Sequence, residues 1–576
     1  MYGLQRFDIE TAPPISDAEI KRRWTWFHQE IRKMSGLWWQ RWAGQLLGEN
    51  TRRYRVVRTI FRPLLKLLRA GRAKPAPTTV TANRADEVFP VNYRPRVIAP
   101  LSSDAVAAAL ERVEIIVVDE SREDVATLIG ELNEVVGTST KTWLLLVDVS
   151  SSEEERHEAA VVLLRAAREE DDVVFGDETG PQPFSPILKS PAVGPHTLLS
   201  YNLVGRPALL RRTIVRDVGG FDEEAGWAFE HDLYLLLRDT NATFHHVAHV
   251  FRAGRSPLAF DASHVNADTL ACVERALARR GWVATTTQGE LPGLVHWRPQ
   301  APLTWPSIDV IIPTRDRVDL VKRCLESIET LTTYPNFDVI ILDNDSVEPE
   351  TLAFFASTSY RVVPCPGPFN YAAIVNRGVA HSGADYVVTL NNDTIVDTPD
   401  WLEQLLGLCA LPDVGVVGAC LLDRDERREH ESIVIAPYPQ HLRTDSNYPH
   451  RDHFALAIKD VAAVTGAVQM VERAFWEHLG GMDEQLKVVM NDVDLCLRAL
   501  LEDRHVIYTP GVRLFHHVGS SRGDLDPLDD RDRFLRRWDI FASFVDPFFP
   551  EALLLLGEKM FYFLRAEEPR RSSEDL

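Results

Sequence analysis

The chain has 576 residues, of which 45% are hydrophobic and 26% are charged, so it is ordinary in composition and too long for a single core. Its 84 acidic residues outnumber its 63 basic residues by 21, which argues against nonspecific binding along nucleic acid as its main role. Length and charge therefore predict two or more globular domains and no nucleic-acid partner.

The cysteines and the first residues indicate the compartment. The six cysteines are scattered, without a CxxC pair or zinc spacing, and most lie in apolar stretches typical of small core residues in a reducing cytosol. The opening residues MYGLQRFDIE carry acids and no apolar segment, so we expect no signal peptide. No uncharged apolar run approaches the roughly 18–20 residues of a membrane-spanning helix. The predicted location is cytoplasmic.

Residues 1–95 are predicted to be a basic, tryptophan-rich helical extension that ends in a linker. Apolar residues recur at helical spacing between Val57 and Leu68, and basic residues follow the same period on a neighbouring face. This pattern suits a helix on an anionic membrane surface, and it equally suits a helix packed on the protein's own acidic body. Two locations therefore stay open: free in the cytoplasm, or peripheral on the inner face of the plasma membrane through residues 1–75.

A diverged internal repeat fills most of the remaining chain. Its first copy (copy one) spans residues 96–285, its second (copy two) spans 307–525, and a Pro-rich linker at 286–306 joins them. The matching segments are VIAPLSSDAVAAALE (97–111) with VIIPTRDRVDLVKRCLE (310–326), EIIVVDES (114–121) with DVIILDNDS (338–346), and WLLLVDVS (143–150) with YVVTLNNDT (386–394). Each copy alternates β-branched runs with amphipathic helical stretches, which predicts two α/β domains with mostly parallel sheets. The tail at 526–576 is predicted to be helical.

Polar residues follow three successive apolar runs of copy two. TRDR follows VIIP, DNDS follows VIIL, and NNDT follows YVVTL, so that Asp343 and Asp393 both come directly after strands. Open α/β sheets bind ligands at the carboxyl ends of their strands, which predicts a ligand cleft at this edge. A single strand-end aspartate with neighbouring amides suits a divalent ion that also binds phosphate oxygens.

Two later segments add carboxylates and imidazoles. NDVDLCLR (491–498) opens a helical pattern in which Asp492 and Asp494 face different directions, so one can point into the cleft while the other caps or pairs. Both could also be acids that the dipole favours at a helix N-terminus. FHHVGSSRG (515–523) places His516 and His517 beside a small polar loop, where they are either metal ligands or ordinary strand-end residues.

Copy two resembles the inverting family 2 glycosyltransferases with the GT-A fold, and among them the bacterial rhamnosyltransferase-like enzymes of O-antigen and cell-wall polysaccharide synthesis. The resemblance covers about 307–525 and depends on the ordered motifs VIIPTRDR, DNDS, FNYAAIVNRGV, LNNDT, VTGAVQMV, GGMDE, NDVDLCLR and FHHVGSSRG. It implies an α/β fold class with two tandem GT-A-like, Rossmann-like domains of mostly parallel sheet, plus helical N-terminal and C-terminal extensions.

The resemblance also implies a nucleotide-sugar donor and a pocket for it. Pro313, Thr314, Arg317 and Asp343 would line the nucleoside pocket. The acceptor would be a hydroxyl of a glycan or a lipid-linked glycan.

The segment LNNDT stands at the position of the family's DxD motif. The resemblance implies that Asp393 holds a Mg²⁺ or Mn²⁺ ion and that Asn392 lies near the ribose or diphosphate. Asn391 replaces the first carboxylate of the motif, which leaves fewer carboxylates for the metal. One of His516 and His517 would face the metal or the diphosphate.

Three further roles follow from the resemblance. Asp492 would be the general base, which removes a proton from the acceptor hydroxyl as that oxygen attacks and inverts the anomeric carbon. Gly466 would let the backbone approach the sugar or the acceptor, and Arg522 would add positive charge nearby. Rhamnose is favoured among donor sugars by the resemblance alone; the acceptor, the linkage and the oligomeric state stay open.

Copy one lacks part of this set. Ser150 stands where copy two has Asp393, and a hydroxyl is a poor substitute for a carboxylate on a divalent ion, although Glu230 and Asp232 remain at the base position. We expect a non-catalytic domain there; a second active site with relaxed metal needs is the alternative. For the whole chain, the rival to a glycosyltransferase is a non-catalytic nucleotide-sugar-binding or scaffold protein of a polysaccharide synthesis complex.

Overall fold

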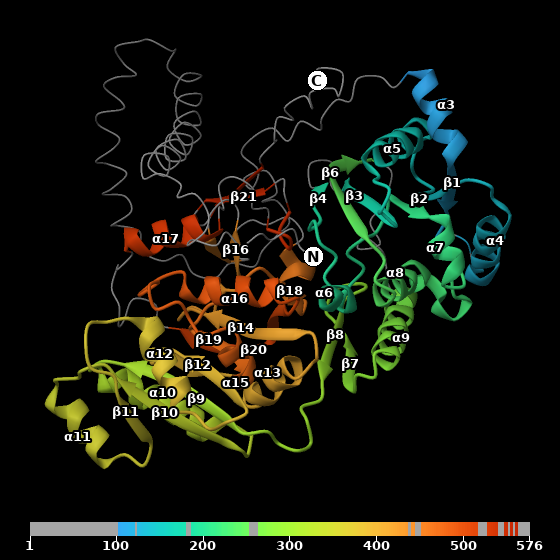
Figure 1. Ribbon diagram of the computed structural model, residues 1–576. Helices are drawn as coiled ribbons and strands as arrows, with labels where there is room; N and C mark the ends of the chain where they lie inside the picture. The colour runs from blue at the N-terminus through green and yellow to red at the C-terminus, as the bar shows by residue number, and fades with distance from the viewer. Residues whose placement is uncertain are drawn as a thin grey trace, which may run out of the picture. The chain divides into compact units, whose positions relative to one another are not determined.

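The two predicted α/β copies each form a sheet with helices packed around it (Figure 1). The structure, a computed structural model, describes residues 102–562 except for 121, 123, 180–185, 253–262, 436–438, 444–450, 517–526, 539–545, 551, 552, 557 and 558. The predicted extension at 1–95 lies outside the described residues, so its membrane contact stays a prediction. No helix in the described part of the chain is both long enough and apolar enough to cross a membrane.

The sheet of copy one, the first sheet, has six strands in the order β1-β2-β5-β3-β4, with β6 paired to β3. Strand β5 runs antiparallel to β2 and β3, whereas the β1–β2 and β3–β6 pairs are parallel. Every residue of β2 is buried, as expected for a strand covered on both faces. The strands are β1 (Val113–Val118), β2 (Trp143–Asp148), β3 (Val173–Thr179), β4 (Pro186–Ile187), β5 (Ala208–Arg211) and β6 (Phe244–Phe251).

The helices of copy one begin where the sequence supplies capping side chains. Ser152 and Glu155 form a capping box at the start of α5, and Asp124 accepts two backbone N–H groups at the start of α4. The helices are α3 (Ser103–Arg112), α4 (Val125–Thr138), α5 (Glu153–Ala166), α6 (Pro195–Ser200), α7 (Arg212–Asp217), η2 (Glu223–Ala228), α8 (Phe229–Asp239) and α9 (Ser263–Arg279).

The predicted linker contains a β-hairpin that the sequence analysis did not predict. Strands β7 (Ala284–Gln288) and β8 (Val295–Pro299) pair antiparallel, and Trp297 in β8 is buried. The segment is therefore anchored to the core and does not behave as a free spacer.

The sheet of copy two, the second sheet, has ten strands in the order β11-β10-β9-β12-β19-β14-β20-β13, with β15 on β14 and β18 on β20. The first four strands are parallel, and β19 runs antiparallel between β12 and β14. The strands are β9 (Ile308–Thr314), β10 (Phe337–Asp343), β11 (Arg361–Pro364), β12 (Tyr386–Leu390), β13 (Thr394–Val396), β14 (Val414–Leu422), β15 (Arg428–His430), β18 (Lys459–Asp460), β19 (Val468–Glu472) and β20 (His505–His516).

The helices of copy two cover this sheet with apolar faces. In α10, Val321, Cys324, Leu325 and Ile328 recur at i, i+3, i+4 and i+7 and are all buried. The helices are α10 (Val318–Leu331), α11 (Pro349–Ser357), α12 (Tyr371–Ala380), α13 (Trp401–Cys409), α14 (Arg451–Leu456), α15 (Arg473–His478) and α16 (Asn491–Leu501). All six cysteines of the chain are buried and free, as expected for small core residues.

The C-terminal tail is only partly helical where it is described. It forms α17 (Leu528–Trp538) and then the antiparallel pair β21 (Leu553–Leu556) and β22 (Lys559–Tyr562). A further small pair, β16 (Ser432–Ile435) and β17 (Pro439–Leu442), lies outside the main sheet. The sequence analysis missed these strands because segments of about four residues are too short for periodicity to distinguish strand from helix.

The repeat is present in the sheet order, but two of the predicted matches are wrong. The segment 97–111 does not take the place of VIIPTRDR, because residues 103–111 lie in helix α3, ahead of β1. Strand β1 pairs directly with β2, as β9 pairs with β12, so EIIVVDES lies in the place of VIIPTRDR and not of DVIILDNDS. Aligned this way, VEIIVVDESRED (113–124) matches IDVIIPTRDRVD (308–319) without a gap. Short apolar runs resemble one another in sequence, so only the strand pairing identifies which strands of the two copies correspond.

Candidate active site

The carboxylate predicted at the end of β12 lies against the end of β20. Strand β13 pairs with β20 so that Thr394 is opposite His516, which brings the preceding residue, Asp393, next to the imidazole. Asp393 Oδ1 is 3.4 Å from His516 Nε2. Asp393 is 4% exposed, and its Oδ1 atom has no hydrogen-bond partner among the described residues. A buried carboxylate oxygen without a partner is costly unless a ligand satisfies it.

A second carboxylate, Glu429 in β15, completes this cluster. Strand β15 folds back on β14, and Glu429 Oε2 lies 3.4 Å from His516 Nδ1. This oxygen is also buried without a hydrogen-bond partner in the described chain. Burial disfavours the His516 imidazolium, but the two carboxylates outweigh that effect and raise the pKa of His516 to about 9.

The sequence analysis missed Glu429 because it lies in DRDERREHE (423–431), which is typical of a solvated loop. Two carboxylates and an imidazole are a donor set that suits Mg²⁺ or Mn²⁺, and the two unpartnered oxygens are where such an ion would bind. The residues present therefore fit the predicted metal.

The ends of β9 and β12 also meet, through a hydrogen bond between two predicted donor-pocket residues. Asn392 Nδ2 donates to Thr314 Oγ1 at 2.8 Å, and both residues are buried. The predicted clustering of these strand ends is thus present in the structure. This hydrogen bond fixes the Asn392 side-chain amide beside the end of β9.

Asp343 lies at the same sheet edge, whereas the Arg317 guanidinium points to other partners. Asp343 is opposite Thr314 in the β9–β10 pair, one position beyond Pro313 and Leu342, and its Oδ1 accepts the Ser346 N–H at 3.0 Å. Arg317 is exposed, adopts a left-handed backbone with φ 52°, and pairs with Asp319 at 3.2 Å. The structure thus gathers the backbones of these positions but leaves the guanidinium at the surface.

The predicted base, Asp492, is held by two backbone N–H groups. It lies in the first turn of α16, where its Oδ2 accepts the Gly466 N–H at 2.9 Å and its Oδ1 accepts the Val493 N–H at 2.9 Å. The Gly466 carbonyl in turn accepts the hydroxyls of Tyr371 at 2.8 Å and Thr389 at 2.9 Å. The Gly466 peptide therefore positions the Asp492 carboxylate against α12 and β12.

Gly466 has little room for a side chain. A Cβ atom there would lie 3.3 Å from Tyr371 Oη and 3.4 Å from Asp492 Cβ, closer than most such contacts. Glycine thus allows the backbone to approach Tyr371 and Asp492 closely, whereas the predicted approach to the sugar or the acceptor stays a prediction.

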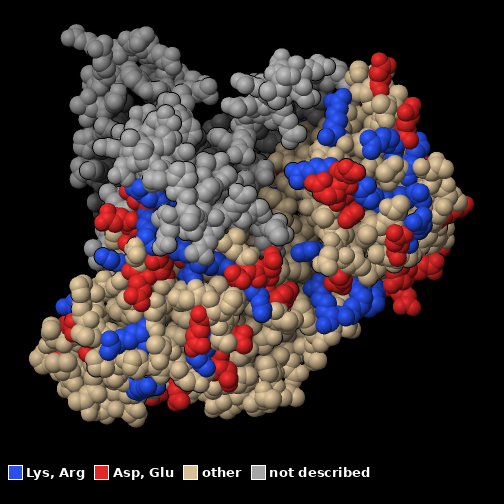
Figure 2. All heavy atoms as spheres, in the orientation of Figure 1, with Lys and Arg blue, Asp and Glu red and all other residues tan. Residues whose placement is uncertain are grey.

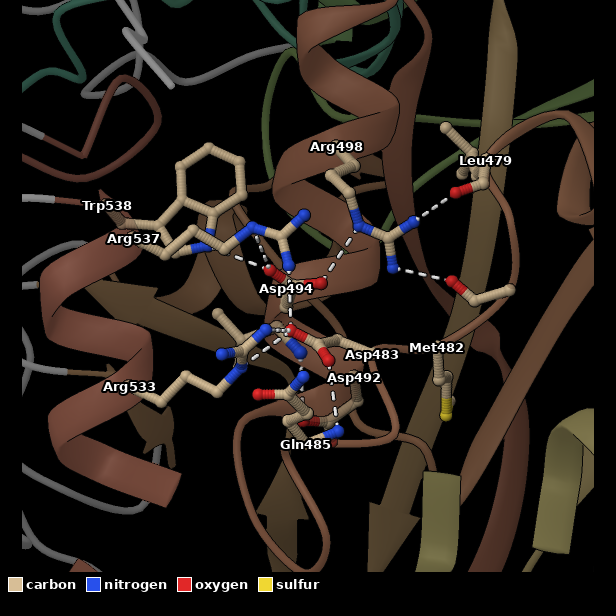
Figure 3. A network of polar contacts seen from close by, with 12 residues as sticks. Leu479, Met482, Asp483, Gln485, Asp492, Asp494, Arg498, Arg533, Arg537 and Trp538 are labelled. Atoms are coloured by element: carbon tan, nitrogen blue, oxygen red, sulfur yellow. Dashed lines mark hydrogen bonds and ion pairs between the residues drawn. The ribbon is translucent and has the colours of Figure 1, made fainter. Parts of the chain in front are cut away.

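Asp494 takes the structural role that the sequence analysis left open between the two aspartates. It is fully buried, and it accepts hydrogen bonds from Arg498 Nε at 2.9 Å and Trp538 Nε1 at 3.0 Å, while Arg537 Nε lies 3.1 Å away (Figure 3). Nearby, Asp483 pairs with Arg537 and Arg533 of α17. Asp494 therefore fastens α17 onto α16, and Asp492 is left as the candidate base.

We expect Asp494→Asn to lower the free energy of unfolding by about 1–3 kcal/mol, because it weakens buried charge-assisted hydrogen bonds. Urea unfolding followed by circular dichroism measures this loss. Once folded, the variant should keep most of its transfer rate, since Asp494 does not face the cleft. An unchanged urea midpoint would contradict the structural assignment.

Two predicted site residues, His517 and Arg522, lie outside the described residues, so their roles stay predictions. On the face drawn in Figure 2, acidic and basic side chains are interspersed.

The first sheet carries an arginine where copy two has a small residue. VGRPALLR (204–211) matches TGAVQMVE (465–472), and both segments lead into the antiparallel neighbour of β2 or β12, so Arg206 replaces Ala467. Arg206 is 2% exposed and pairs with Glu230 at 2.6 Å, Glu120 at 2.7 Å and Asp148 at 3.5 Å.

The Arg206 guanidinium forms ion pairs with the carboxylates that lie at this edge of the first sheet. Glu230 is the second residue of α8, as Asp492 is the second residue of α16, so Arg206 holds the counterpart of the candidate base. The same register places Ser150 at the position of Asp393, as the sequence analysis expected. Sequence reasoning missed Arg206 because a lone arginine before a strand carries no motif.

Comparison with known proteins gives one matching family and several relatives. The profile described as "Glycosyl transferase family 2" matches residues 309–475. The chain is 32% identical over 382 residues to the uncharacterized protein y4gI of Sinorhizobium fredii, covering 62% of this chain and 42% of that protein. It is 30% identical over 360 residues to the O-antigen biosynthesis protein RfbC of Myxococcus xanthus, covering 60% and 28%. The chain thus spans less than half the length of either relative.

Two more distant similarities were found. An N-acetylglucosaminyl-diphospho-decaprenol L-rhamnosyltransferase of Mycobacterium tuberculosis is 24% identical over 228 residues, covering 35% of this chain and 73% of that protein. Among solved structures, the mannosyltransferase PcManGT from Pyrobaculum calidifontis, in complex with GDP-Man and Mn²⁺, is 19% identical with a TM-score of 0.30, covering 45% of this chain and 67% of that one.

Proposed function

We propose that this chain, whose residues 309–475 form a family 2 glycosyl transferase domain, moves a sugar from a nucleotide-sugar donor to a hydroxyl of a glycan or lipid-linked glycan. The transfer inverts the anomeric carbon, depends on a divalent metal and serves surface polysaccharide synthesis. The observation that carries the proposal is the buried Asp393 Oδ1 atom, which lies 3.4 Å from His516 Nε2 and accepts no hydrogen bond from the described residues. The names of the O-antigen and rhamnosyltransferase relatives support the substrate class, with rhamnose as the first donor sugar to test.

The donor would bind along the carboxyl ends of β9, β10 and β12. We assign the nucleoside to the edge formed by Pro313, Thr314 and Asp343, and the ribose or diphosphate to the neighbourhood of Asn392. Arg317 could reach this edge only by leaving Asp319, an exchange that is inexpensive because exposed ion pairs contribute about 0–1 kcal/mol.

Asp393, Glu429 and His516 would hold a Mg²⁺ or Mn²⁺ ion, with His517 as the other predicted imidazole ligand. When bound, such an ion neutralises the charge that develops on the leaving nucleoside diphosphate. The chain itself would hold the ligands in place before the donor binds. The His516 imidazole lies 3.4 Å from the Asp393 carboxylate and 3.4 Å from the Glu429 carboxylate. Such preorganisation avoids reorganisation of the site during the reaction.

Asp492 would act as the general base. The two backbone N–H groups that it accepts fix the carboxylate relative to Gly466. It would take the proton of the acceptor hydroxyl while that oxygen attacks the anomeric carbon from the face opposite the diphosphate.

Copy one is proposed to be non-catalytic. Its Glu230 is held in an ion pair with Arg206, and Ser150 stands at the position of the proposed metal-binding aspartate. All transfer would then depend on copy two.

A screen of nucleotide sugars with Mn²⁺ tests the proposal, with released nucleoside diphosphate as the readout. We expect one donor to give turnover that a chelator abolishes, and we expect Asp393→Asn to remove transfer altogether. Asp397→Asn is a matched control, because Asp397 follows strand β13 of the same sheet but pairs with Arg513 at 2.9 Å. Tight donor binding without turnover by the wild-type chain would favour the scaffold alternative, and residual transfer by Asp393→Asn would point to activity in copy one.

A further inference from the structure

A buried group of histidines and aspartates lies where copy one meets copy two. His196 at the start of α6 is fully buried, and its imidazole stacks with Trp282 at 5.7 Å and Trp297 at 6.1 Å between ring centroids. The ring of His505, the first residue of β20, meets it edge-on at 4.9 Å. The His196 side chain is therefore clamped in one orientation by three rings.

Asp460 in β18 fixes both imidazoles from behind. Its Oδ1 lies 2.9 Å from His196 Nδ1 and 2.7 Å from His505 Nδ1. Its Oδ2 accepts the backbone N–H groups of His196 at 3.0 Å and Thr197 at 2.9 Å, at the N-terminus of α6. A carboxylate that accepts Nδ1–H from an imidazole leaves the Nε2 lone pair available, which is the usual support of a metal-binding histidine.

A third ligand atom, from Asp413, lies in front of His196. Asp413 Oδ1 is 3.5 Å from His196 Nε2, and neither atom has a hydrogen-bond partner in the described part of the chain. Ligand atoms of His196, Asp413 and His505 all lie within 4.8 Å of one another. Two ligands at about 2.1 Å from a tetrahedral zinc ion are about 3.4 Å apart, so the His196–Asp413 separation already suits one shared ion.

We propose that His196, His505 and Asp413 bind one divalent cation of the Zn²⁺ class, with Asp460 as the carboxylate that orients both imidazoles. None of these residues belongs to the proposed donor cleft, so the site is separate from the proposed function. Two imidazoles and one carboxylate suit Zn²⁺ and not Mg²⁺, which prefers oxygen ligands and several waters. The Asp413 side chain is 35% exposed and provides the access route from solvent.

The bound ion would join elements that are far apart in the sequence. His196 belongs to α6 in copy one, whereas Asp413 precedes β14 and His505 begins β20 in copy two. Asp413 and His505 are already linked, since the His505 N–H donates to the Asp413 carbonyl at 2.7 Å. The ion would therefore cross-link His196 of copy one to Asp413 and His505 of copy two, which are already joined by this hydrogen bond.

The same residues could instead hold a proton on His196. Burial disfavours the imidazolium, but Asp460 and Asp413 outweigh burial and raise the pKa of His196 to about 9. A proton and a metal ion compete for the same Nε2 atom. The experiment must therefore detect the ion itself.

Cobalt titration of the full-length chain, after treatment with a chelator, tests the site. The Asp393→Asn variant serves as the parent protein, so that the proposed donor cleft contributes no metal signal. We expect about one equivalent of Co²⁺ to give the intense visible absorption of a tetrahedral ion, and Zn²⁺ to displace it. Asp413→Asn and His505→Gln should each lose this band and weaken Zn²⁺ binding in calorimetry at least tenfold.

His245→Gln is the matched control. His245 also pairs with an aspartate of copy one, since its Nδ1 lies 2.6 Å from Asp171 Oδ2. This variant should keep the Co²⁺ band. Circular dichroism should show that Asp413→Asn is folded, because this residue is partly exposed. Absence of a stoichiometric Co²⁺ band in the parent, or a band that survives Asp413→Asn, overturns the proposal in favour of the protonated pair. Transfer activity is a separate readout, since the parent variant is expected to have none.

Discussion

Asp492→Asn is expected to lower kcat by about 10²–10⁴-fold, because an amide cannot accept the proton of the acceptor hydroxyl and general-base help is typically of this size. The substitution preserves the shape of the side chain. Its oxygen can still accept the N–H of Gly466 or of Val493, although its NH₂ group must then face the other donor. We therefore expect a stability loss of about 1–3 kcal/mol at most.

The measurement is kcat at saturating donor and acceptor, with urea unfolding in parallel. The Michaelis constant of the donor should change little, because Asp492 acts on the acceptor. Asp494→Asn is the paired control: it lies two residues away on the same helix and should lose stability while keeping its rate. A kcat within threefold of wild type for Asp492→Asn would remove this residue from the catalytic role.

The second large effect concerns stability in copy one. Arg206→Met is expected to lower the free energy of unfolding by about 3–5 kcal/mol, because it removes one partner of a buried ionic cluster. Glu120, Asp148 and Glu230 would then be left without the cation that each contacts. Burial and the neighbouring carboxylates raise the pKa of Glu120 even against the lowering effect of Arg206.

Chemical denaturation at neutral pH measures this effect, and Arg216→Met is the matched control. Arg216 is exposed and pairs with the exposed Asp217 at 2.9 Å, so its loss should change stability by about 0–1 kcal/mol. Equal effects of the two substitutions would show that the Arg206 cluster is not a buried ionic site. Glu230→Gln combined with Arg206→Met should recover part of the loss, since one unpaired carboxylate is then removed.

Local patterns predicted most of the fold and half of the candidate site. The apolar runs and polar strand ends of copy two predicted that Thr314, Asn392 and Asp393 lie at one edge of the sheet, and the structure brings them there. The two-residue spacing of Asp492 and Asp494 predicted that they face different directions, which the network around Asp494 confirms.

The remaining features depend on pairings between distant segments. Glu429 reaches His516 only because β15 folds back on β14, and a charged loop in the sequence gives no sign of that return. The place of β1 beside β2 follows from strand pairing, whereas the sequence offered two equally apolar candidates for the same position. Arg206 finds its three carboxylates across separations of 24 to 86 residues, which no local pattern encodes.

The Arg206 cluster also limits how the two copies could exchange roles over time. To open this part of copy one, the guanidinium must be lost, and that single step leaves two buried carboxylates and one partly buried carboxylate without a cation. Loss of any one carboxylate first removes one of the three ion pairs of Arg206. Each single-substitution route back therefore passes through a less stable protein. The cluster thus opposes stepwise substitution in the interior of copy one, whereas the described part of copy two has alanine at the matching position 467.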